Sequence, residues 1–243
     1  MQRLVPRLLE HRVLAVLRTA GAGSDAVSQL CAAFDGGVRV LAVSLGVDNA
    51  HEVVQSARER CLLQTGSGPE GGPALIGCVT VSSVAEASEA VSRGADFIGC
   101  AAPHRGVMRW CAANDVLCIP TCVHDALPAV VSGGCTLVNL IPPAGLVNED
   151  NKKRRRFRVG PTALTRAAWL KAVRVSFPMV LPILTAGVTI DDAGEVLRQG
   201  AEAVAISDEL FFTDGEEQTY AQVRSNAARL VASVQSAIEA RKR

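Results

Sequence analysis

The chain has 243 residues, a length that suits a single α/β barrel, and one domain spanning residues 1–243 is expected. With 49% hydrophobic and 20% charged residues, the composition excludes a disordered or collagen-like chain. The formal net charge of +1 gives no general reason to expect binding to nucleic acid or to an anionic membrane. No apolar run reaches the ~18 residues that a membrane-spanning helix needs, so no membrane insertion is expected.

Short apolar runs alternate with amphipathic segments along the chain, a pattern that predicts alternating strands and helices. Strands are predicted at 13–17, 39–45, 74–78, 96–100, 116–120, 136–145, 180–184 and 203–207. Helices are predicted at 25–34, after Ser24 as the N-cap, and at 49–61, 83–93, 105–114, 124–132, 161–175, 190–199 and 216–240. Eight βα units in a chain of this length predict a (β/α)8 TIM barrel, with a doubly wound parallel sheet as the alternative.

Two segments interrupt the repeat. Residues 64–72 are rich in glycine and have no periodicity, which indicates a surface insertion. Residues 149–159 are strongly basic, and this second insertion is either a solvated loop or a patch that binds an acidic protein partner or nucleic acid. The residues of this candidate interaction patch are Lys152, Lys153, Arg154, Arg155, Arg156 and Arg158.

The eight cysteines are spread over predicted strands and helices without a CxxC pair. A chain of this size does not need disulfides for stability, so the thiols are expected to be reduced and buried, with no metal site. These reduced cysteines favour a soluble protein in a reducing compartment, which is the cytoplasm or the stroma or matrix of an organelle. A plastid is included in case a leader peptide preceded residue 1. No cofactor is expected.

The stretch TLVNLIPPAG at 136–145 is an apolar run interrupted by a single amide, Asn139. A polar side chain in a buried strand requires hydrogen-bond partners, so a specific environment is expected around it. In a (β/α)8 barrel the chemistry is at the carboxyl ends of the strands, which places Asn139 at the barrel mouth with residues that end other strands, such as Arg18, Thr80 and Ser207.

Six segments in order carry a family resemblance: VLAVLR at 13–18, GGVRVLAVSL at 36–45, GCVTV at 77–81, RGADFIGCAAPH at 93–104, TLVNLIPPAG at 136–145 and LTAGVTIDDAGEVLRQGAEAVAIS at 184–207. Together they resemble the 2-keto-3-deoxy-6-phosphogluconate (KDPG/KHG) aldolase family, over most of the chain. The family comprises class I aldolases that cleave a phosphorylated sugar acid to pyruvate and glyceraldehyde 3-phosphate. The resemblance implies a barrel of class I aldolase type and a homotrimer.

Three positions depart from the family's catalytic pattern. The lysine that forms the Schiff base in strand 6 corresponds to Asn139, whose amide has no lone pair able to form an imine. The glutamate that transfers protons in strand 2 corresponds to Ala42, and the arginine that binds the substrate carboxylate corresponds to Gly46. No catalytic residue is therefore assigned. Lys152 and Lys153 in the basic insertion remain as candidates for a relocated Schiff base.

Part of the family's binding apparatus is retained. The resemblance implies ligand contacts for Arg18, Thr80 and Asn139, for the turn Thr185, Ala186 and Gly187 after strand 7, and for Ser207 after strand 8. Such backbone turns favour phosphate groups. Ala186 stands where the family has glycine, and the nearby Asp208 and Glu209 repel phosphate, so this site is expected to be weakened.

Three functions remain open at this point. The first is a barrel that has lost lyase activity, a pseudoenzyme with a structural or protein-interaction role. The second is a module that binds a small anion, either a phosphorylated keto acid or a carboxylate. The third is an active aldehyde lyase of the KDPG/KHG type that uses relocated groups. The simultaneous loss of lysine, glutamate and arginine favours the first.

Overall fold

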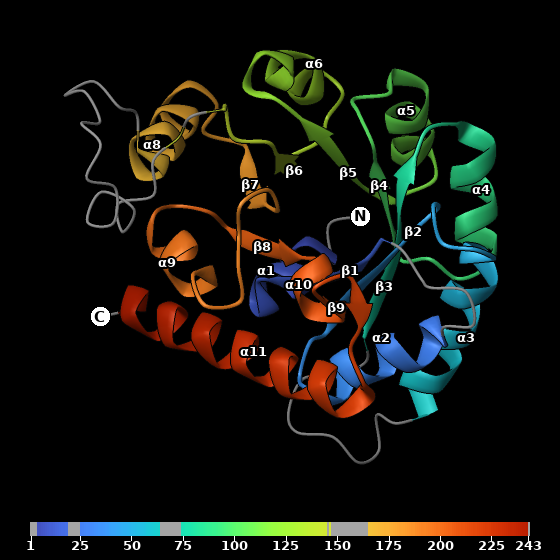
Figure 1. The fold of residues 1–243 in the computed structure, drawn as a ribbon. Coiled ribbons are helices and arrows are strands. Elements are labelled where there is room, and N and C mark those ends of the chain that lie inside the picture. Colours follow the sequence, from blue (N-terminus) through green and yellow to red (C-terminus); the bar gives the residue numbers. More distant parts are fainter. Residues whose placement is uncertain (1–3, 19–24, 64–73, 145, 147–164, 243) are drawn as a thin grey trace.

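Eight parallel strands form the core of the molecule and close into a barrel in the order of the sequence (Figure 1). The computed structural model describes residues 4–18, 25–63, 74–144, 146 and 165–242. The strands are β1 (Val13–Leu17), β2 (Val40–Ser44), β3 (Leu75–Val81), β4 (Phe97–Cys100), β5 (Leu117–Cys122), β6 (Leu137–Leu140), β7 (Leu181–Leu184) and β8 (Ala203–Ile206). The predicted (β/α)8 barrel is confirmed.

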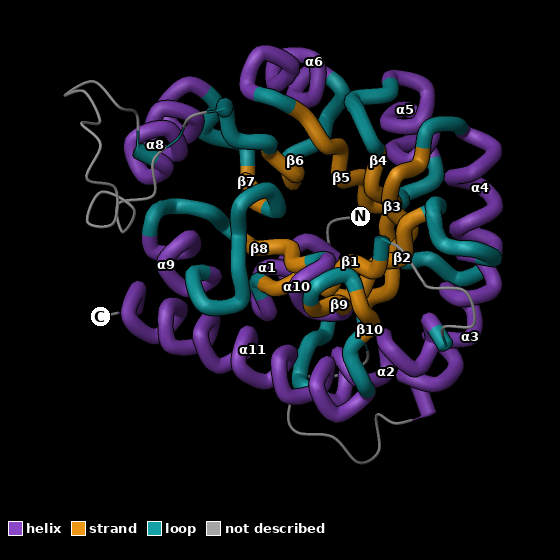
Figure 2. The backbone as a smooth tube through the Cα atoms, in the orientation of Figure 1, coloured by secondary structure: helices purple, strands orange, loops and turns teal. Residues whose placement is uncertain are grey.

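Helices surround the barrel and cover the outer face of its strands, except α1 and α10, which lie at its two ends (Figure 2). They are α1 (Leu4–His11), α2 (Ala26–Asp35), α3 (Ala50–Leu63), α4 (Val84–Ser92), α5 (Arg105–Ala113), α6 (Leu127–Ser132), α8 (Arg166–Ser176), α9 (Ala193–Arg198), α10 (Asp208–Phe211) and α11 (Tyr220–Lys242), with a 3-10 helix at His124–Ala126. The two predicted insertions, 64–72 and 149–159, lie outside the described residues, as do the lysines and arginines of the basic patch.

Capping residues explain several helix starts. Ser83 accepts a hydrogen bond from the backbone N–H of Glu86, whose carboxylate accepts one from the N–H of Ser83, and this capping box begins α4. The N-cap of α2 is Asp25, which accepts from the N–H of Ser28 at 3.0 Å. The predicted N-cap, Ser24, was therefore wrong by one residue, because the carboxylate of Asp25 reaches the donors of the first turn.

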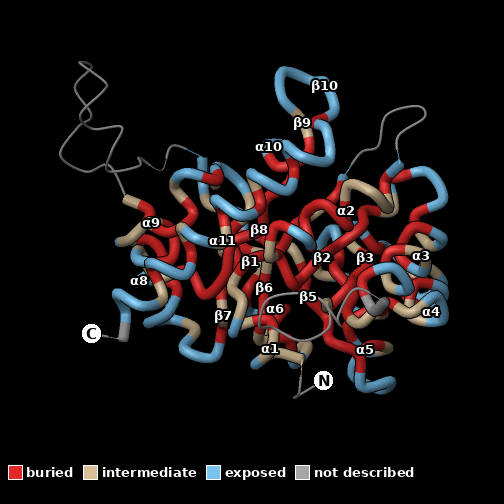
Figure 3. Tube along the Cα trace, turned by 90° about the horizontal axis from the view of Figure 1, so that it is seen from below, coloured by how far each residue is buried: buried red, intermediate tan, exposed pale blue. Residues whose placement is uncertain are grey.

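The barrel has two chemically different ends. Helix α1, which the sequence pattern did not predict, closes the amino-terminal end, and its Leu8 is fully buried against the inward-facing strand residues. Helix α10 and a short hairpin lie at the opposite end (Figure 3). The inner cluster consists of Leu8, Leu14, Val40, Ala42, Leu75, Phe97, Leu117, Ile119, Leu137, Ile183, Ala203 and Ala205.

The last predicted helix, 216–240, was wrong at its start. Strands β9 (Phe212–Thr213) and β10 (Glu216–Glu217) pair antiparallel around Asp214 and Gly215, which have φ angles of 53° and 86°. Asp-Gly with positive φ at both positions is the typical sequence of a two-residue hairpin turn. Helix α11 begins after it, at Tyr220.

Other helix and strand boundaries shift by a few residues. The predicted helix at 190–199 is confined to Ala193–Arg198, because Asp192 bonds to the hydroxyl and the backbone N–H of Thr189 and so stabilises the preceding loop. The predicted sixth strand, 136–145, is a strand only over Leu137–Leu140, flanked by single inter-strand hydrogen bonds at Thr136 and Ile141. It ends there because Pro142 and Pro143 have no N–H to donate.

All eight cysteines are free and buried, as predicted. Cys118 lies in β5 with its sulfur 3.6 Å from that of Cys100 in β4. Hydrogen bonding to Cys100, Cys111 and Cys135 together with burial raises the pKa of Cys118. Within the described part of the chain, no three His, Cys, Asp or Glu side chains are grouped so as to hold a metal ion, and no helix has the length and hydropathy to cross a bilayer.

Candidate functional site

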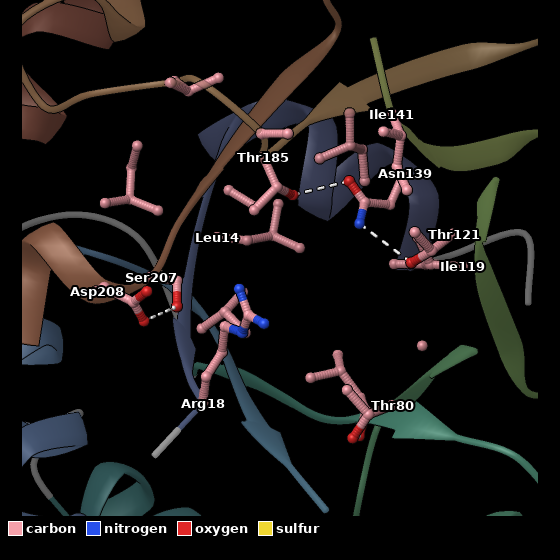
Figure 4. Close-up of a pocket in the computed structure, with 18 of the residues that line it drawn as sticks. Leu14, Arg18, Thr80, Ile119, Thr121, Asn139, Ile141, Thr185, Ser207 and Asp208 are labelled. Atoms are coloured by element: carbon pink, nitrogen blue, oxygen red, sulfur yellow. Dashed lines mark hydrogen bonds between the residues drawn. The ribbon is translucent and has the colours of Figure 1, made fainter. Parts of the chain in front are cut away.

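A cavity of about 530 Å³ opens at the carboxyl-terminal end of the barrel strands (Figure 4). Most of its walls are aliphatic side chains from inside the barrel, and its polar groups are gathered at the rim. Its lining includes every candidate ligand-binding residue from the sequence: Arg18, Thr80, Asn139, Thr185, Ala186, Gly187 and Ser207. The barrel topology therefore brings together residues far apart in the chain, such as Arg18 and Ser207, which are 189 positions apart.

Asn139 is held between hydroxyl groups of the two neighbouring strands. The Thr185 hydroxyl, at the end of β7, donates to Asn139 Oδ1 at 2.7 Å, and Asn139 Nδ2 donates to Thr121 Oγ1 in β5 at 3.1 Å. Figure 4 shows this Thr121–Asn139–Thr185 network on one wall of the cavity. One N–H of the Asn139 amide and the hydroxyl proton of Thr121 are not used within the network. The orientation of the amide is fixed, and both unused donors are available to a ligand.

Thr80 organises the opposite wall. Its hydroxyl accepts from the backbone N–H of Leu45 at 3.0 Å and lies 3.0 Å from Ser44 Oγ, which in turn accepts from the N–H of Gly46. Thr80 has a φ of 63°, and it lies within an irregularity in the pairing of β3 with β4, between Cys78 and Val81. Positive φ is unfavourable for a β-branched residue, so the backbone is strained at this point of the rim.

Charged groups lie on the third side of the rim. Arg18 follows β1, and its guanidinium extends into the cavity between Thr80 and Ser207 (Figure 4). Ser207 is buried and donates to Asp208 Oδ1 at 2.9 Å. Among the described residues, the side chains of Arg18, Asp208 and Glu209 make no ion pair. This side of the rim therefore presents one cation and two carboxylates.

The loop after β7 is fixed from outside the barrel. Arg166 of α8 is 7% exposed, donates to the carbonyl oxygen of Gly187 at 3.1 Å and approaches Asp192 at 3.4 Å. Gly187 has a φ of 70°, a conformation that favours glycine. Glu209 of α10 accepts from the N–H of Ile190 in the same loop at 2.9 Å. These contacts hold the Thr185–Gly187 turn in place at the cavity rim.

The remaining two family positions do not line the cavity. Ala42 is fully buried in the barrel interior, and Gly46 is exposed beyond the end of β2. A Cβ on Gly77, the neighbour of Ala42 in β3, would lie 2.3 Å from the Phe97 ring. Phe97 fills the space in front of Gly77, and Ala42 is fully buried in the same inner cluster, so a longer side chain at Ala42 would have to displace packed residues.

The sequence analysis assigned no ligand contact to Thr121, which follows a predicted strand, and no role to Arg166. Glu209 was expected only to repel phosphate, and its part in fixing the β7 loop was not anticipated. Thr121 could have been found from the alternation of side chains along a strand. It lies two residues after Ile119, which faces the barrel interior, so its hydroxyl is expected on the same side. No comparable signal exists for Arg166, which acts from an outer helix.

No protein-family model matches the sequence, and no curated protein matches it. Solved structures are similar in fold. The 4-hydroxy-2-oxoglutarate/KDPG aldolase from TTHB1 has a TM-score of 0.70 at 19% identity, covering 95% of this chain and 98% of that one. The KDPG aldolase of Zymomonas mobilis ZM4 with 3-phosphoglycerate has a TM-score of 0.70 at 19% identity over 96% of each chain.

A third similar structure is the KDPG aldolase of Legionella pneumophila, with pyruvate captured as a covalent carbinolamine. It has a TM-score of 0.61 at 19% identity, covering 95% of this chain and 97% of that one. At this identity the likeness establishes the shared barrel fold, and activity must be argued from the side chains at the mouth.

Proposed function

We propose that this protein is a barrel of the KDPG aldolase type that does not perform Schiff-base lyase chemistry and whose mouth binds a small carboxylate compound. The observation that supports this most directly is the position of Asn139. The sequence resemblance matches Asn139 to the family's nucleophilic lysine, and its amide is held by Thr121 and Thr185 at the cavity.

Imine formation requires an amine lone pair that attacks the keto carbon, followed by loss of the carbonyl oxygen as water. The amide nitrogen of Asn139 is conjugated with its carbonyl and cannot begin this step. Proton transfer also needs an acid or base, and Ala42, which the resemblance matches to the family's glutamate, is a methyl group buried in the barrel wall. The carboxylates that do line the cavity, Asp208 and Glu209, accept hydrogen bonds from the Ser207 hydroxyl and the Ile190 N–H. Among the described residues that line the cavity there is no lysine.

Binding is supported by the groups that remain. Arg18 provides a guanidinium that can donate two parallel hydrogen bonds to a carboxylate. The unused N–H of Asn139 and the hydroxyl of Thr121 can donate to a second oxygen of the same ligand. A cavity of about 530 Å³ with mostly apolar walls and a few convergent polar groups is typical of small-molecule sites.

Borohydride trapping with pyruvate tests the loss of lyase chemistry. The purified full chain is incubated with pyruvate and sodium borohydride, and intact-mass spectrometry is expected to show no adduct. A stable adduct on any lysine, including Lys152 or Lys153, would support the active lyase with relocated groups and contradict the proposal. Asn139→Lys provides the positive control, because it places an amine at the family position.

Calorimetric titration with 2-oxo acids tests the binding role. We expect binding in the wild type and a loss of about tenfold or more in affinity in Arg18→Gln, which removes a charge-assisted contact. Arg109→Gln, an exposed position on α5 that does not line the cavity, is the matched control. Equal affinities in wild type and Arg18→Gln would contradict the assigned carboxylate contact.

A protein-interaction role is the second candidate, supported by the basic run at 152–158. Replacing its six basic residues with glutamine is expected to abolish capture of an acidic protein partner while the thermal unfolding temperature stays the same. A homotrimer is proposed from the resemblance alone, and light scattering of the purified chain tests it.

A further inference from the structure

The chain's own carboxylates occupy the corner of the mouth between β7 and β8. In (β/α)8 barrels this corner, with a short extra helix after strand 8, frequently binds phosphate. Helix α10 is the short extra helix here, and its first two residues are Asp208 and Glu209. Both acidic side chains line the cavity.

Carboxylates also bind backbone donors of the loop that continues from this corner, just outside the cavity lining. Glu209 Oε2 accepts from the N–H of Ile190 at 2.9 Å, and Asp192 Oδ1 accepts from the N–H of Thr189 at 2.6 Å. The Ser207 hydroxyl donates to Asp208 Oδ1. A phosphate group entering this corner would face the carboxylates of Asp208 and Glu209 in a partly enclosed space, where repulsion is stronger than in bulk water.

We infer that Asp208 and Glu209 determine the ligand class of the mouth by excluding phosphorylated compounds, so that the ligand is an unphosphorylated monocarboxylate with an apolar tail. This inference rests on the proposed binding function and narrows it. If phosphorylated compounds are excluded, the ligand of this barrel differs in class from a sugar acid phosphate.

The other walls fit such a ligand. Arg18 is the single cation among the described cavity residues, and it matches one carboxylate. Beyond it the cavity is lined by hydrophobic side chains, among them Leu14, Val79, Phe97, Ile119 and Ile183. These walls offer no hydrogen bonds to the hydroxyl groups of a sugar acid and would bury a branched or aromatic tail.

A titration of the full chain with matched ligands tests the inference. Glycerate and 3-phosphoglycerate differ only by the phosphate, inorganic phosphate probes the corner alone, and 4-methyl-2-oxopentanoate provides an apolar tail. We expect 4-methyl-2-oxopentanoate to bind most tightly, and 3-phosphoglycerate to bind at least ~10-fold more weakly than glycerate because of charge repulsion.

Asp208→Asn/Glu209→Gln removes both charges and keeps the shapes, and the amide oxygen introduced by Glu209→Gln can still accept from the N–H of Ile190. This variant is expected to gain at least ~10-fold in affinity for inorganic phosphate. The control, Asp214→Asn/Glu216→Gln, removes two charges from the exposed hairpin, outside the cavity, and is expected to leave phosphate affinity unchanged.

Each outcome separates the two proposals. Tighter binding of 3-phosphoglycerate than of glycerate by the wild type would overturn the ligand class and leave the binding function intact. An equal gain of phosphate affinity in the hairpin control would overturn the exclusion role, because net charge alone would then explain it. Absence of binding for every carboxylate would overturn the binding function, whereas a phosphate gain confined to Asp208→Asn/Glu209→Gln would still support exclusion.

Discussion

The two ends of this barrel differ in whether their charged side chains form ion pairs. At the amino-terminal end, Glu202 bonds to Arg12 at 2.7 Å and to Arg174 at 2.6 Å. Asp96 likewise pairs with Arg58 at 2.8 Å. At the mouth, the side chains of Arg18, Asp208 and Glu209 have no ion-pair partner among the described residues.

This difference indicates that the amino-terminal end contributes mainly to stability and the mouth mainly to ligand binding. Paired charges and the apolar side of α1 close the amino-terminal end, whereas the mouth keeps hydrogen-bond donors that are not used within its Thr121–Asn139–Thr185 network. Barrels generally use the amino-terminal end for stability and the carboxyl-terminal end for chemistry. Substitutions at the two ends should therefore differ in what they change.

Restoring the family's acid at Ala42 should have the largest effect. Ala42→Glu buries a carboxylate in a barrel wall that has no space or partner for it, and should lower the free energy of unfolding by at least ~3 kcal/mol. Urea denaturation measures this. Asn139→Lys, at the cavity, should change stability by less than ~1 kcal/mol because its amine can reach water. Equal stability of Ala42→Glu and wild type would show that the barrel interior is open beside β2.

Glu202→Gln should be the next most damaging change, at the amino-terminal end. It leaves Arg12 and Arg174 without their carboxylate, and the unfolding free energy should fall by about 2–3 kcal/mol, less than for a fully buried pair because Arg174 is 44% exposed. The control is Glu195→Gln, which breaks the exposed pair with Arg198 and should cost less than ~0.5 kcal/mol. Similar losses for both variants would show that the Glu202 cluster does not stabilise this end.

Cys78 in β3, in the barrel wall between the two ends, should make the free energy of unfolding decrease at alkaline pH. Burial raises its pKa to about 12, whereas an unfolded thiol has a pKa near ~8.5. The unfolded state thus loses its proton first, so this stabilisation is complete below pH ~8.5 and is lost as pH rises toward the folded pKa. Between pH 7 and 10, the stability advantage of wild type over Cys78→Ala should shrink by about 2 kcal/mol in urea titrations. A constant difference would contradict the shift.

The sequence predicted the barrel and the location of its mouth because both follow from repeating local patterns. Apolar runs mark each strand, and parallel strands in a closed barrel bring their carboxyl ends together. Arg18, Asn139 and Ser207 could be placed at one site on that basis alone. The Asp-Gly turn of the β9–β10 hairpin was also recognisable, but the helical pattern that follows it obscured the turn.

The hydrogen bonds of the site could not be predicted. Asn139 bonds to Thr121 and Thr185, which are 18 and 46 residues away, and choosing these partners requires the strand register and the side-chain rotamers. Arg166 reaches the mouth from an outer helix across 21 residues, with no sequence pattern to mark it. Helix α1 was missed because it has only eight residues, one of them Pro6.

Thr80 should give the smallest stability change and the clearest distinction between strain and bonding at the mouth. Thr80→Val keeps the strained β-branched backbone and loses the bonds to Ser44 and to the N–H of Leu45, so stability should fall by about 1–2 kcal/mol. Thr80→Gly loses the same bonds but relieves the positive φ, so its stability should stay within ~1 kcal/mol of wild type. Denaturant midpoints should therefore rank the glycine variant above the valine variant. The reverse order would mean that the positive φ of Thr80 costs little, and that the rim stores no strain at this residue.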